Sequence, residues 1–280
     1  MSEQIDKALR WGSEQILVCS DSPRLDAELL LAHCLGKPRS YLFSWPEKIL
    51  EEACWKQFQA LVQLRIKPTP VAYLLGSREF YSLEFTTNAS ALVPRQETEL
   101  LVEVALQHCR VGQELRILEL GTGSGIIAIT VKKHRPLCHL LASDIDPACL
   151  QLAHANAIHH GVDIEFVESS WFDRIEDGLK FDLILSNPPY IAAHHPFLAQ
   201  GDLPAEPYIA LSPGETGLEA LEQIIAGASA YLAERGYLML EHGYDQQQPV
   251  RQLLQKQGFE EVQCLLDSNE LPRVSIARLA

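Results

Sequence analysis

The sequence predicts an α/β fold built on a seven-stranded, mostly parallel sheet with a C-terminal antiparallel hairpin. Strand-like and helical patterns alternate over residues 96–280, as expected for parallel strands connected by helices that cover both faces of a sheet. The last two strand-like runs are too close together for a crossover, so they can pair only as a hairpin. The seven runs are Leu115–Leu120, Cys138–Ser143, Ile164–Glu168, Phe181–Ser186, Tyr237–Glu241, Phe259–Leu266 and Arg273–Leu279.

Apolar residues at helical spacing predict the helices of this α/β domain. These helices are expected over Glu97–Cys109, Ile126–His134, Pro147–His160, Leu218–Ala233 and Gln246–Gln257. Residues 1–75 carry helical patterns alone, including a Ser22-Pro23 helix start and a long helix over Glu47–Lys67 that Pro68 and Pro70 end. We therefore expect a small helical bundle over residues 1–75.

Residues 76–95 are predicted to form a β-hairpin linker between these two domains. Glu79–Phe85 is aromatic and alternates in polarity, and Ala91–Val93 is a second short apolar run. Thr87–Ser90 lies between them and has the composition of a turn. The expected domain boundaries are thus 1–75, 76–95 and 96–280.

The charge is distributed unevenly along the chain. The formal net charge is −14, with 10 basic and 11 acidic side chains in residues 1–90 against 13 basic and 26 acidic in residues 91–280. An acidic domain repels phosphate backbones, which argues against direct nucleic-acid binding. The apolar runs are too short to span a bilayer, and the N-terminus does not resemble a secretory signal, so we expect a cytoplasmic protein without membrane contact.

Cysteine and histidine spacing predicts neither disulfides nor a metal site. The seven cysteines are odd in number, and no two form a CxxC pair. Two His-His pairs occur, but a metal site needs three or four converging ligands.

A glycine-rich turn is the first motif with a chemical meaning. Glu119-Leu120-Gly121-Thr122-Gly123-Ser124-Gly125 follows a predicted strand and opens a predicted helix. Glycines allow a sharp turn and the close approach of a ligand. The spacing is GxGxG, so the third glycine of the dinucleotide motif is missing, and Glu119 would repel a pyrophosphate. Glu119 is instead suited to a positively charged amino group.

The next predicted strand adds a carboxylate at its tip. Asp144 follows Gly125 by 19 residues and can accept hydrogen bonds from both hydroxyls of a ribose. Asp146 is the alternative, although its place before Pro147 is typical of a helix N-cap. An adenosyl ligand that carries an amino group and no phosphate fits both motifs, which predicts S-adenosylmethionine.

The most specific motif is Asn187-Pro188-Pro189-Tyr190, directly after the strand Phe181–Ser186. Two consecutive prolines make a rigid loop and remove two backbone donors. The Asn187 side-chain oxygen and the Pro188 carbonyl can each accept one hydrogen of a planar NH2 group. Tyr190 offers a flat wall for a planar substrate. We expect these four residues to hold the methyl acceptor.

With these motifs the chain resembles the bacterial peptide chain release factor glutamine methyltransferases, a family of class I enzymes with a Rossmann-like fold. The resemblance covers nearly the whole chain and rests also on four further segments: Ser22–Leu30, Gly76–Tyr81, Val93–Glu99 and Leu240–Gly243. It implies methylation of the glutamine nitrogen in the Gly-Gly-Gln motif of class 1 release factors, which are thus the expected partners.

The resemblance also implies roles for individual residues. S-adenosylmethionine would be bound by Gly121, Thr122, Gly123, Ser124, Gly125, Asp144, Trp171 and Asn187, with Trp171 beside the adenine. Residues 1–75 would recognise the release factor. The chain departs from the family pattern at Gln96 and at Pro204-Ala205.

Two kinds of methyltransferase that act on other substrates have a similar acceptor motif. A ribosomal-protein glutamine methyltransferase shares Asn-Pro-Pro-Tyr, but Ser22–Leu30 and Gly76–Tyr81 favour the release-factor enzymes. An adenine-N6 DNA methyltransferase is disfavoured by the acidic α/β domain. A protein that keeps the fold without catalysis is disfavoured by the complete set of Glu119, Asp144 and Asn187.

Overall fold

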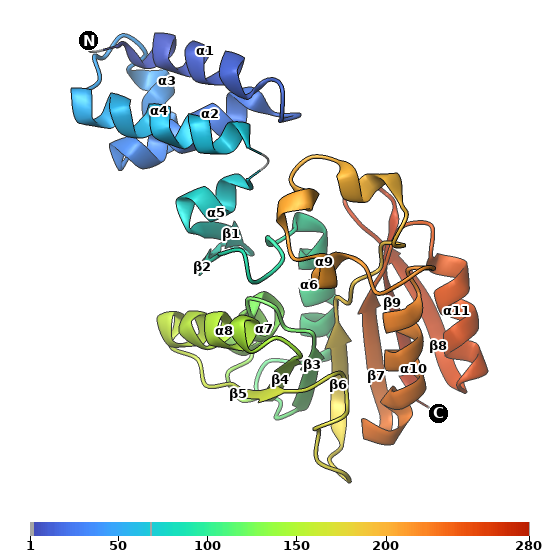
Figure 1. Cartoon of the computed structure of the whole chain (residues 1–280). Helices are drawn as coiled ribbons and strands as arrows, with labels where there is room; N and C mark the ends of the chain where they lie inside the picture. Colours follow the sequence, from blue (N-terminus) through green and yellow to red (C-terminus); the bar gives the residue numbers. More distant parts are fainter. Residues whose placement is uncertain (1–2, 68, 280) are drawn as a thin grey trace. The chain divides into compact units, whose positions relative to one another are not determined.

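The computed structural model describes residues 3–67 and 69–279 (Figure 1). The chain divides into two compact units. The helical unit comprises Met1–Ser77 and Ala199–Glu206, and the sheet unit comprises Arg78–Leu198 and Pro207–Ala280.

The helical unit contains five helices around one apolar core. They are α1 (Ile5–Ile16), α2 (Pro23–Leu35), α3 (Arg39–Ser44), α4 (Glu52–Ile66) and α5 (Val71–Leu75). The core side chains include Leu9, Leu30, Leu31, Phe58 and Val62, all of them at most 1 % exposed. Within the described residues, no helix is long and apolar enough to cross a bilayer.

The prediction of one helix over Glu47–Lys67 was wrong at its start. Helix α4 begins at Glu52, because the preceding residues pair with the N-terminal segment: Leu50 N donates to Glu3 O at 2.8 Å, and Ile49 forms a β-bridge with Gln4. These backbone partners are distant in sequence, so helical spacing did not reveal them. Pro68, which was expected to end the helix, lies outside the described residues.

A buried arginine explains why a second chain segment belongs to the helical unit. Arg65 is 3 % exposed, and its Nε donates to Asp26 Oδ2 at 2.8 Å. Its Nη1 lies 2.7 Å from Asp202 Oδ1, at the start of the short helix η3 (Leu203–Ala205). Two carboxylates thus compensate one buried cation, and the pairing holds residues 199–206 against the helices.

A hairpin is present in the linker region, but the predicted turn was wrong. Strands β1 (Ser77–Phe80) and β2 (Leu83–Thr86) pair through Tyr81 and Ser82, whose φ angles are 52° and 60°. Glu99 Oε1 accepts from Tyr81 N at 2.8 Å and Glu79 Oε1 from Ser82 N at 2.6 Å, which stabilises a turn without glycine. The polar run Thr87–Ser90 forms a separate loop, and Ala91–Val93 is not a strand.

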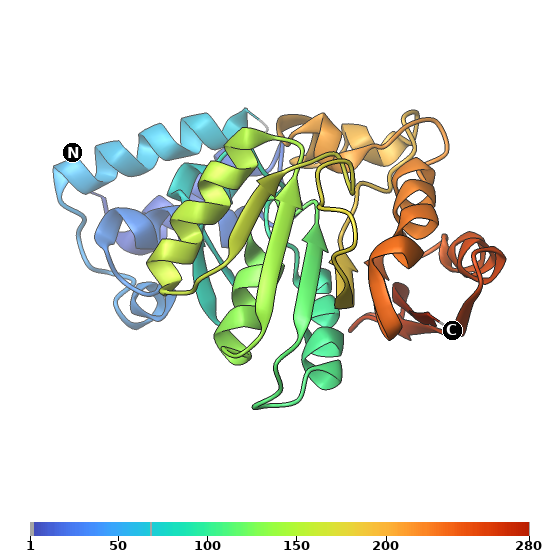
Figure 2. The same ribbon diagram turned by 90° about the horizontal axis from the view of Figure 1, so that it is seen from below.

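The sheet unit contains the predicted seven-stranded sheet. Its strand order is β5-β4-β3-β6-β7-β9-β8, in which β9 runs antiparallel to both β7 and β8 and the other neighbouring pairs are parallel. The strands are β3 (Arg116–Leu120), β4 (His139–Asp144), β5 (Glu165–Glu168), β6 (Phe181–Ser186), β7 (Leu232–Glu241), β8 (Phe259–Leu266) and β9 (Pro272–Leu279). Figure 2 shows the parallel strands side by side.

Alternate residues of the strands pack against helices on the two faces of this sheet. Ile117 and Leu185 belong to a core shared with α6 and α7, whereas Leu118 and Ile184 belong to a core shared with α10 and α11. The helices and short helical turns are η1 (Gln96–Thr98), α6 (Glu99–His108), α7 (Ile126–His134), α8 (Pro147–His160), η2 (Pro196–Ala199), α9 (Tyr208–Leu211), α10 (Glu219–Tyr231) and α11 (Gln247–Lys256). The α/β fold class predicted from the sequence is confirmed.

Candidate active site

The register of three neighbouring strands brings the predicted motifs together. Leu120, the last residue of β3, pairs with Ser143 of β4 and with Ser186 of β6. The residues that follow each strand therefore leave the sheet at the same edge, where open α/β sheets bind ligands. The glycine turn and Asn187 follow their strands at this edge, and Asp144 is the last residue of β4.

A cavity of about 290 Å³ lies at this edge, within the sheet unit. Eight of the nine residues proposed for the cofactor line it: Glu119, Gly121, Thr122, Gly123, Ser124, Asp144, Trp171 and Asn187. Pro189 of the acceptor motif also lines it, whereas Gly125, Pro188 and Tyr190 adjoin the lining without belonging to it. Gln96, Pro204 and Ala205, which depart from the family pattern, are not part of the lining.

The third glycine of the turn serves helix packing. Gly125 has a φ of 84°, and a Cβ built on it would lie 2.8 Å from Ile129 Cδ1 and 3.1 Å from Ala153 Cβ. Only glycine allows both this backbone conformation and the close approach of α7 to α8. Asn156 of α8 fixes the turn further, because its Nδ2 donates to Ser124 O at 2.9 Å.

Glu119 is fully buried, and only one of its two carboxylate oxygens has hydrogen-bond partners among the described residues. Its Oε2 accepts from Thr122 Oγ1 at 2.7 Å and from Ala128 N at 2.9 Å. Its Oε1 has no hydrogen-bond partner among the described residues. Burial raises the pKa of Glu119 to about 8, and the nearby Asp144 carboxylate adds to this rise. A cationic group in the cavity would supply the missing partner and compensate the buried charge.

Asp144 closes the glycine turn. Its Oδ2 accepts from Gly123 N at 2.8 Å, and its Oδ1 accepts from Asp146 N at 3.0 Å. Burial raises its pKa. Each carboxylate oxygen keeps a further lone pair for a ligand hydroxyl. Asp146 is the N-cap of α8, where its Oδ1 accepts from Ala148 N at 2.8 Å, as its position before Pro147 predicted.

Trp171 forms part of the cavity wall beside the first glycine. It has a φ of 48°, and its backbone carbonyl accepts from Ser169 Oγ at 3.0 Å. A Cβ built on Gly121 would lie 3.6 Å from Trp171 Cζ3. The indole thus offers an apolar surface next to the glycine turn, in the place expected for a stacked base.

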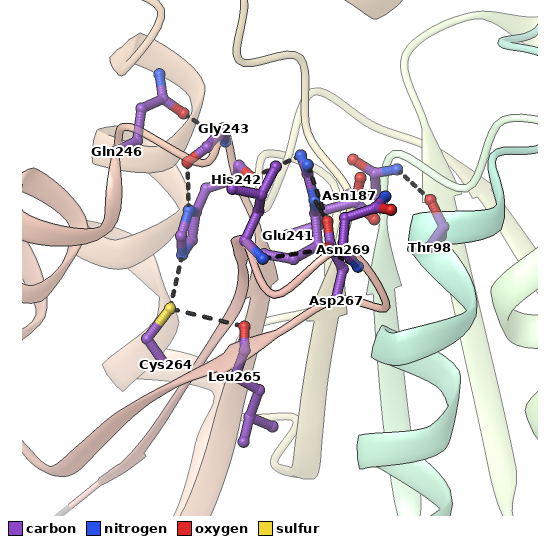
Figure 3. A network of polar contacts seen from close by, with 12 residues as sticks. Thr98, Asn187, Glu241, His242, Gly243, Gln246, Cys264, Leu265, Asp267 and Asn269 are labelled. Atoms are coloured by element: carbon purple, nitrogen blue, oxygen red, sulfur yellow. Dashed lines mark hydrogen bonds and ion pairs between the residues drawn. The ribbon is translucent and has the colours of Figure 1, made fainter.

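The amide of Asn187 has a defined orientation. Its Nδ2 donates to Thr98 Oγ1 at 3.0 Å, which leaves the Oδ1 as the acceptor of the side chain. Figure 3 shows this contact between Asn187 and Thr98. Thr98 also lines the cavity and is 1 % exposed. The same loop is held from behind, since Gln246 Nε2 donates to Tyr190 O at 2.9 Å and to Gly217 O at 3.2 Å.

Tyr190 points toward a buried carboxylate at the end of β7. Its hydroxyl donates to Glu241 Oε1 at 3.2 Å. Burial and the proximity of Glu241 both raise the pKa of Tyr190. The ring packs against the apolar cluster on the α10–α11 face of the sheet. Its phenol therefore remains a neutral donor.

Sequence reasoning missed the roles of Thr98 and Glu241 in this site. Both occur in segments that carried the family resemblance, Val93–Glu99 and Leu240–Gly243, but no local pattern indicated their contact. Arg95 was also missed, and among the described residues that line the cavity it alone has a basic side chain. The sequence signal of Glu241 is an acid at the carboxyl end of a predicted strand, which by itself is too common to locate a site residue.

The polar groups of this cavity fit S-adenosylmethionine. The unpartnered oxygen of Glu119 suits an amino group, Asp144 suits a ribose, and Trp171 suits an adenine. A single arginine and two buried carboxylates make a poor site for a pyrophosphate.

Sequence comparison identifies relatives over almost the whole chain. Residues 7–76 match the family model described as PrmC N-terminal domain, and residues 95–200 match the Methyltransferase small domain. A release factor glutamine methyltransferase from Xylella fastidiosa is 45 % identical over 256 residues, which cover 91 % of this chain and 93 % of that protein. One from Aliivibrio fischeri is 39 % identical over 280 residues, which cover 99 % and 98 %.

Solved structures agree with the fold. A methyltransferase from Pyrococcus furiosus has a TM-score of 0.55 at 18 % identity and covers 79 % of this chain and 96 % of its own. At that identity the likeness supports the fold alone. The sequence relatives go further, because the alignments span at least 91 % of both proteins at 39–45 % identity. The chain belongs to the family of release factor glutamine methyltransferases.

Proposed function

We propose that this protein transfers the methyl group of S-adenosylmethionine to the side-chain amide nitrogen of the glutamine in the Gly-Gly-Gln motif of class 1 peptide chain release factors. The observation that carries the proposal is the orientation of Asn187. Thr98 takes up its NH2 group, so its carbonyl oxygen is available to accept a hydrogen bond from a substrate amide. Membership of the family supplies the identity of the substrate.

The proposed mechanism is positioning of the amide nitrogen. An amide nitrogen is a weak nucleophile, because its lone pair is delocalised into the carbonyl. Asn187 Oδ1 and the Pro188 carbonyl accept its two hydrogens and direct the nitrogen toward the methyl group. Such alignment can lower a barrier by ~7–11 kcal/mol. As positive charge develops on the nitrogen, both acceptors bind its hydrogens more strongly, which stabilises the transition state.

S-adenosylmethionine supplies an activated methyl group on a sulfonium. In the proposed cofactor site, Glu119 faces the amino group, Asp144 accepts from the ribose hydroxyls, and the glycine turn passes close to the ligand. Trp171 covers the adenine. The proton released by the methylated nitrogen passes to water.

We propose that the helical unit recognises the release factor. It is nearly neutral, unlike the acidic sheet unit, and its sequence carries no glycine-rich turn. Three large apolar side chains in residues 43–49 are exposed: Phe43 (58 %), Trp45 (53 %) and Ile49 (63 %). A remote contact of this kind lowers the cost of positioning the glutamine. The reaction then takes place in the cytoplasm, where release factors act.

Labelled S-adenosylmethionine and a panel of three acceptors test the function. The panel contains a purified class 1 release factor, a glutamine-methylated ribosomal protein in its unmodified form, and duplex DNA. We expect transfer to the release factor. A faster transfer to either of the other acceptors would refute the proposed substrate. Replacement of Trp45 by Ala should slow transfer to the whole factor and leave the slow transfer to a short Gly-Gly-Gln peptide unchanged.

A further inference from the structure

Glu241 is a buried carboxylate that the proposed mechanism does not use. It is the last residue of β7, is 1 % exposed, and lies next to the acceptor motif at the carboxyl edge of the sheet. Burying an acid costs free energy unless its neighbours compensate it. Such a residue at an active site therefore requires an explanation.

Two hydroxyl groups donate to this carboxylate. Tyr190 donates from its phenol at 3.2 Å, and the Thr98 side chain also hydrogen-bonds to Glu241. Thr98 Oγ1 in turn accepts from Asn187 Nδ2 at 3.0 Å. Figure 3 shows Thr98, Asn187 and Glu241 converging from η1, from the end of β6 and from the end of β7.

The direction of these hydrogen bonds depends on Glu241. A hydroxyl has one hydrogen, and an ionised carboxylate can only accept, so Thr98 must donate its hydrogen to Glu241. Its oxygen is then available to accept from Asn187. If the residue at position 241 were itself a donor, Thr98 would be free to donate to Asn187, and the amide could turn its NH2 group into the cavity.

We propose that Glu241 is a positioning residue for methyl transfer, which acts through Thr98 and Tyr190 to keep the carbonyl oxygen of Asn187 facing the substrate amide. This inference rests on the proposed function. It assigns to Glu241 no contact with the substrate or the cofactor. It predicts that replacing Glu241 by an uncharged side chain of the same shape lowers kcat and leaves the affinity for S-adenosylmethionine nearly unchanged.

The charges around Glu241 determine when it is ionised. Burial, and to a smaller extent Glu97, raise the pKa of Glu241, whereas the hydroxyls of Thr98 and Tyr190 and the Arg273 guanidinium lower it, which leaves the pKa at about 7. Arg273 also pairs with Asp267 at 3.2 Å. The adjacent His242 is buried, which lowers its pKa and keeps it neutral. Protonation of Glu241 should thus disturb the network as the pH falls below about 7.

The test compares Glu241→Gln with the parent protein and with a matched control, Asp182→Asn. Asp182 is also an acid on the sheet, and it accepts from Arg116 N at 2.8 Å, but it lies at the opposite end of β6. With a whole release factor and saturating S-adenosylmethionine, we expect kcat to fall about 10–100-fold in Glu241→Gln alone. The Kd of S-adenosylmethionine should change less than about twofold.

A pH profile separates this role from a structural one. The kcat of the parent protein should fall about tenfold per pH unit below pH 7, and Glu241→Gln should lack this inflection. If Glu241→Gln folds poorly, Thr98→Val and Thr98→Ser replace it in the test. Only Ser keeps the hydroxyl, so we expect kcat to fall in Thr98→Val and to stay near the parent value in Thr98→Ser. A parent-like kcat in folded Glu241→Gln, or in Thr98→Val if Glu241→Gln does not fold, would overturn the role of Glu241. Absence of transfer by the parent protein would overturn the proposed function instead.

Discussion

The two halves of the cavity are built in different ways. In the cofactor half, at β3 and β4, the hydrogen bonds of Glu119 and Asp144 described above join residues at most 21 positions apart. In the acceptor half, at β6 and β7, every contact of Asn187 and Tyr190 described above comes from a distant part of the chain. The cofactor half can therefore be recognised in the sequence, whereas the acceptor half depends on the fold.

This difference has a chemical reason. A cofactor is bound in its ground state, so Glu119 Oε1 can lack a partner among the described residues until the cationic group of the ligand binds. An acceptor group must be aligned for the transition state, so its side chains are held by further hydrogen bonds. Substitutions in the cofactor half should therefore change mainly the affinity for S-adenosylmethionine, and substitutions in the acceptor half should change mainly kcat.

Removal of Asn187 should have the largest effect. We expect Asn187→Ala to lower kcat at least about 10²–10³-fold, because an interaction made mainly in the transition state is lost. Titration calorimetry should show a nearly unchanged Kd for S-adenosylmethionine. If affinity and rate fall equally, Asn187 is a cofactor residue and the proposed division of the cavity is wrong.

Asp144→Ala should have the opposite profile. The loss of hydrogen bonds to a charged group should weaken S-adenosylmethionine binding by ~1.5–3 kcal/mol, with a smaller effect on kcat at saturation. The variant also loses the contact with Gly123 N. An unchanged Kd would transfer the ribose role to Asp146.

Gly125→Ala tests the packing behind the cofactor half. A φ of 84° strains a non-glycine residue by ~1–2 kcal/mol, and the new Cβ would also lie 3.1 Å from Ala153 Cβ. Gly178→Ala is the matched control, because Gly178 has the same φ and no atom within 4 Å of a built Cβ. We expect Gly125→Ala to lower both Tm and cofactor affinity more than the control. Equal losses in the two variants would mean that backbone strain alone is responsible.

The smallest effect concerns the pH dependence of stability. Burial raises the pKa of Glu119 from 4.5 to about 8, so the folded, ligand-free protein retains a proton that the unfolded chain releases. The stability from this proton is complete below about pH 4.5 and is lost as the pH rises through about 8. Glu119→Gln cannot ionise, so its Tm relative to the parent protein should increase between about pH 5 and pH 9. Each kcal/mol corresponds to ~2–4 °C. A constant difference in Tm over this range would contradict the buried, titrating state of Glu119.

Much of this architecture could be predicted because its determinants are local. The hydrophobic periods of the strands and helices predicted the sheet. Gly121 and Asn187 directly follow strands, and Asp144 is the last residue of one, all at the same edge. The sequence signal for the helix start at Asp146, which precedes Pro147, was equally local. The failures involve partners that are far apart in sequence. Glu99 supports the glycine-free turn at Tyr81.

The same reason explains the missed part of the site. The contact from Asn187 to Thr98 joins residues 89 positions apart, and the contact from Tyr190 to Glu241 joins residues 51 positions apart. No spacing rule connects such residues, and a glutamate at a strand end is unremarkable in isolation. Only the sheet order, which places β7 beside β6, brings Glu241 to the acceptor motif.

Mass spectrometry of the release factor tests the central claim most directly. A purified class 1 release factor is incubated with this protein and S-adenosylmethionine and then digested, and the Gly-Gly-Gln peptide is fragmented. The account predicts one added methyl group on the side-chain nitrogen of the glutamine with the parent protein, and none with Asn187→Ala. A methyl group on any other residue, or equal methylation by both proteins, would contradict it.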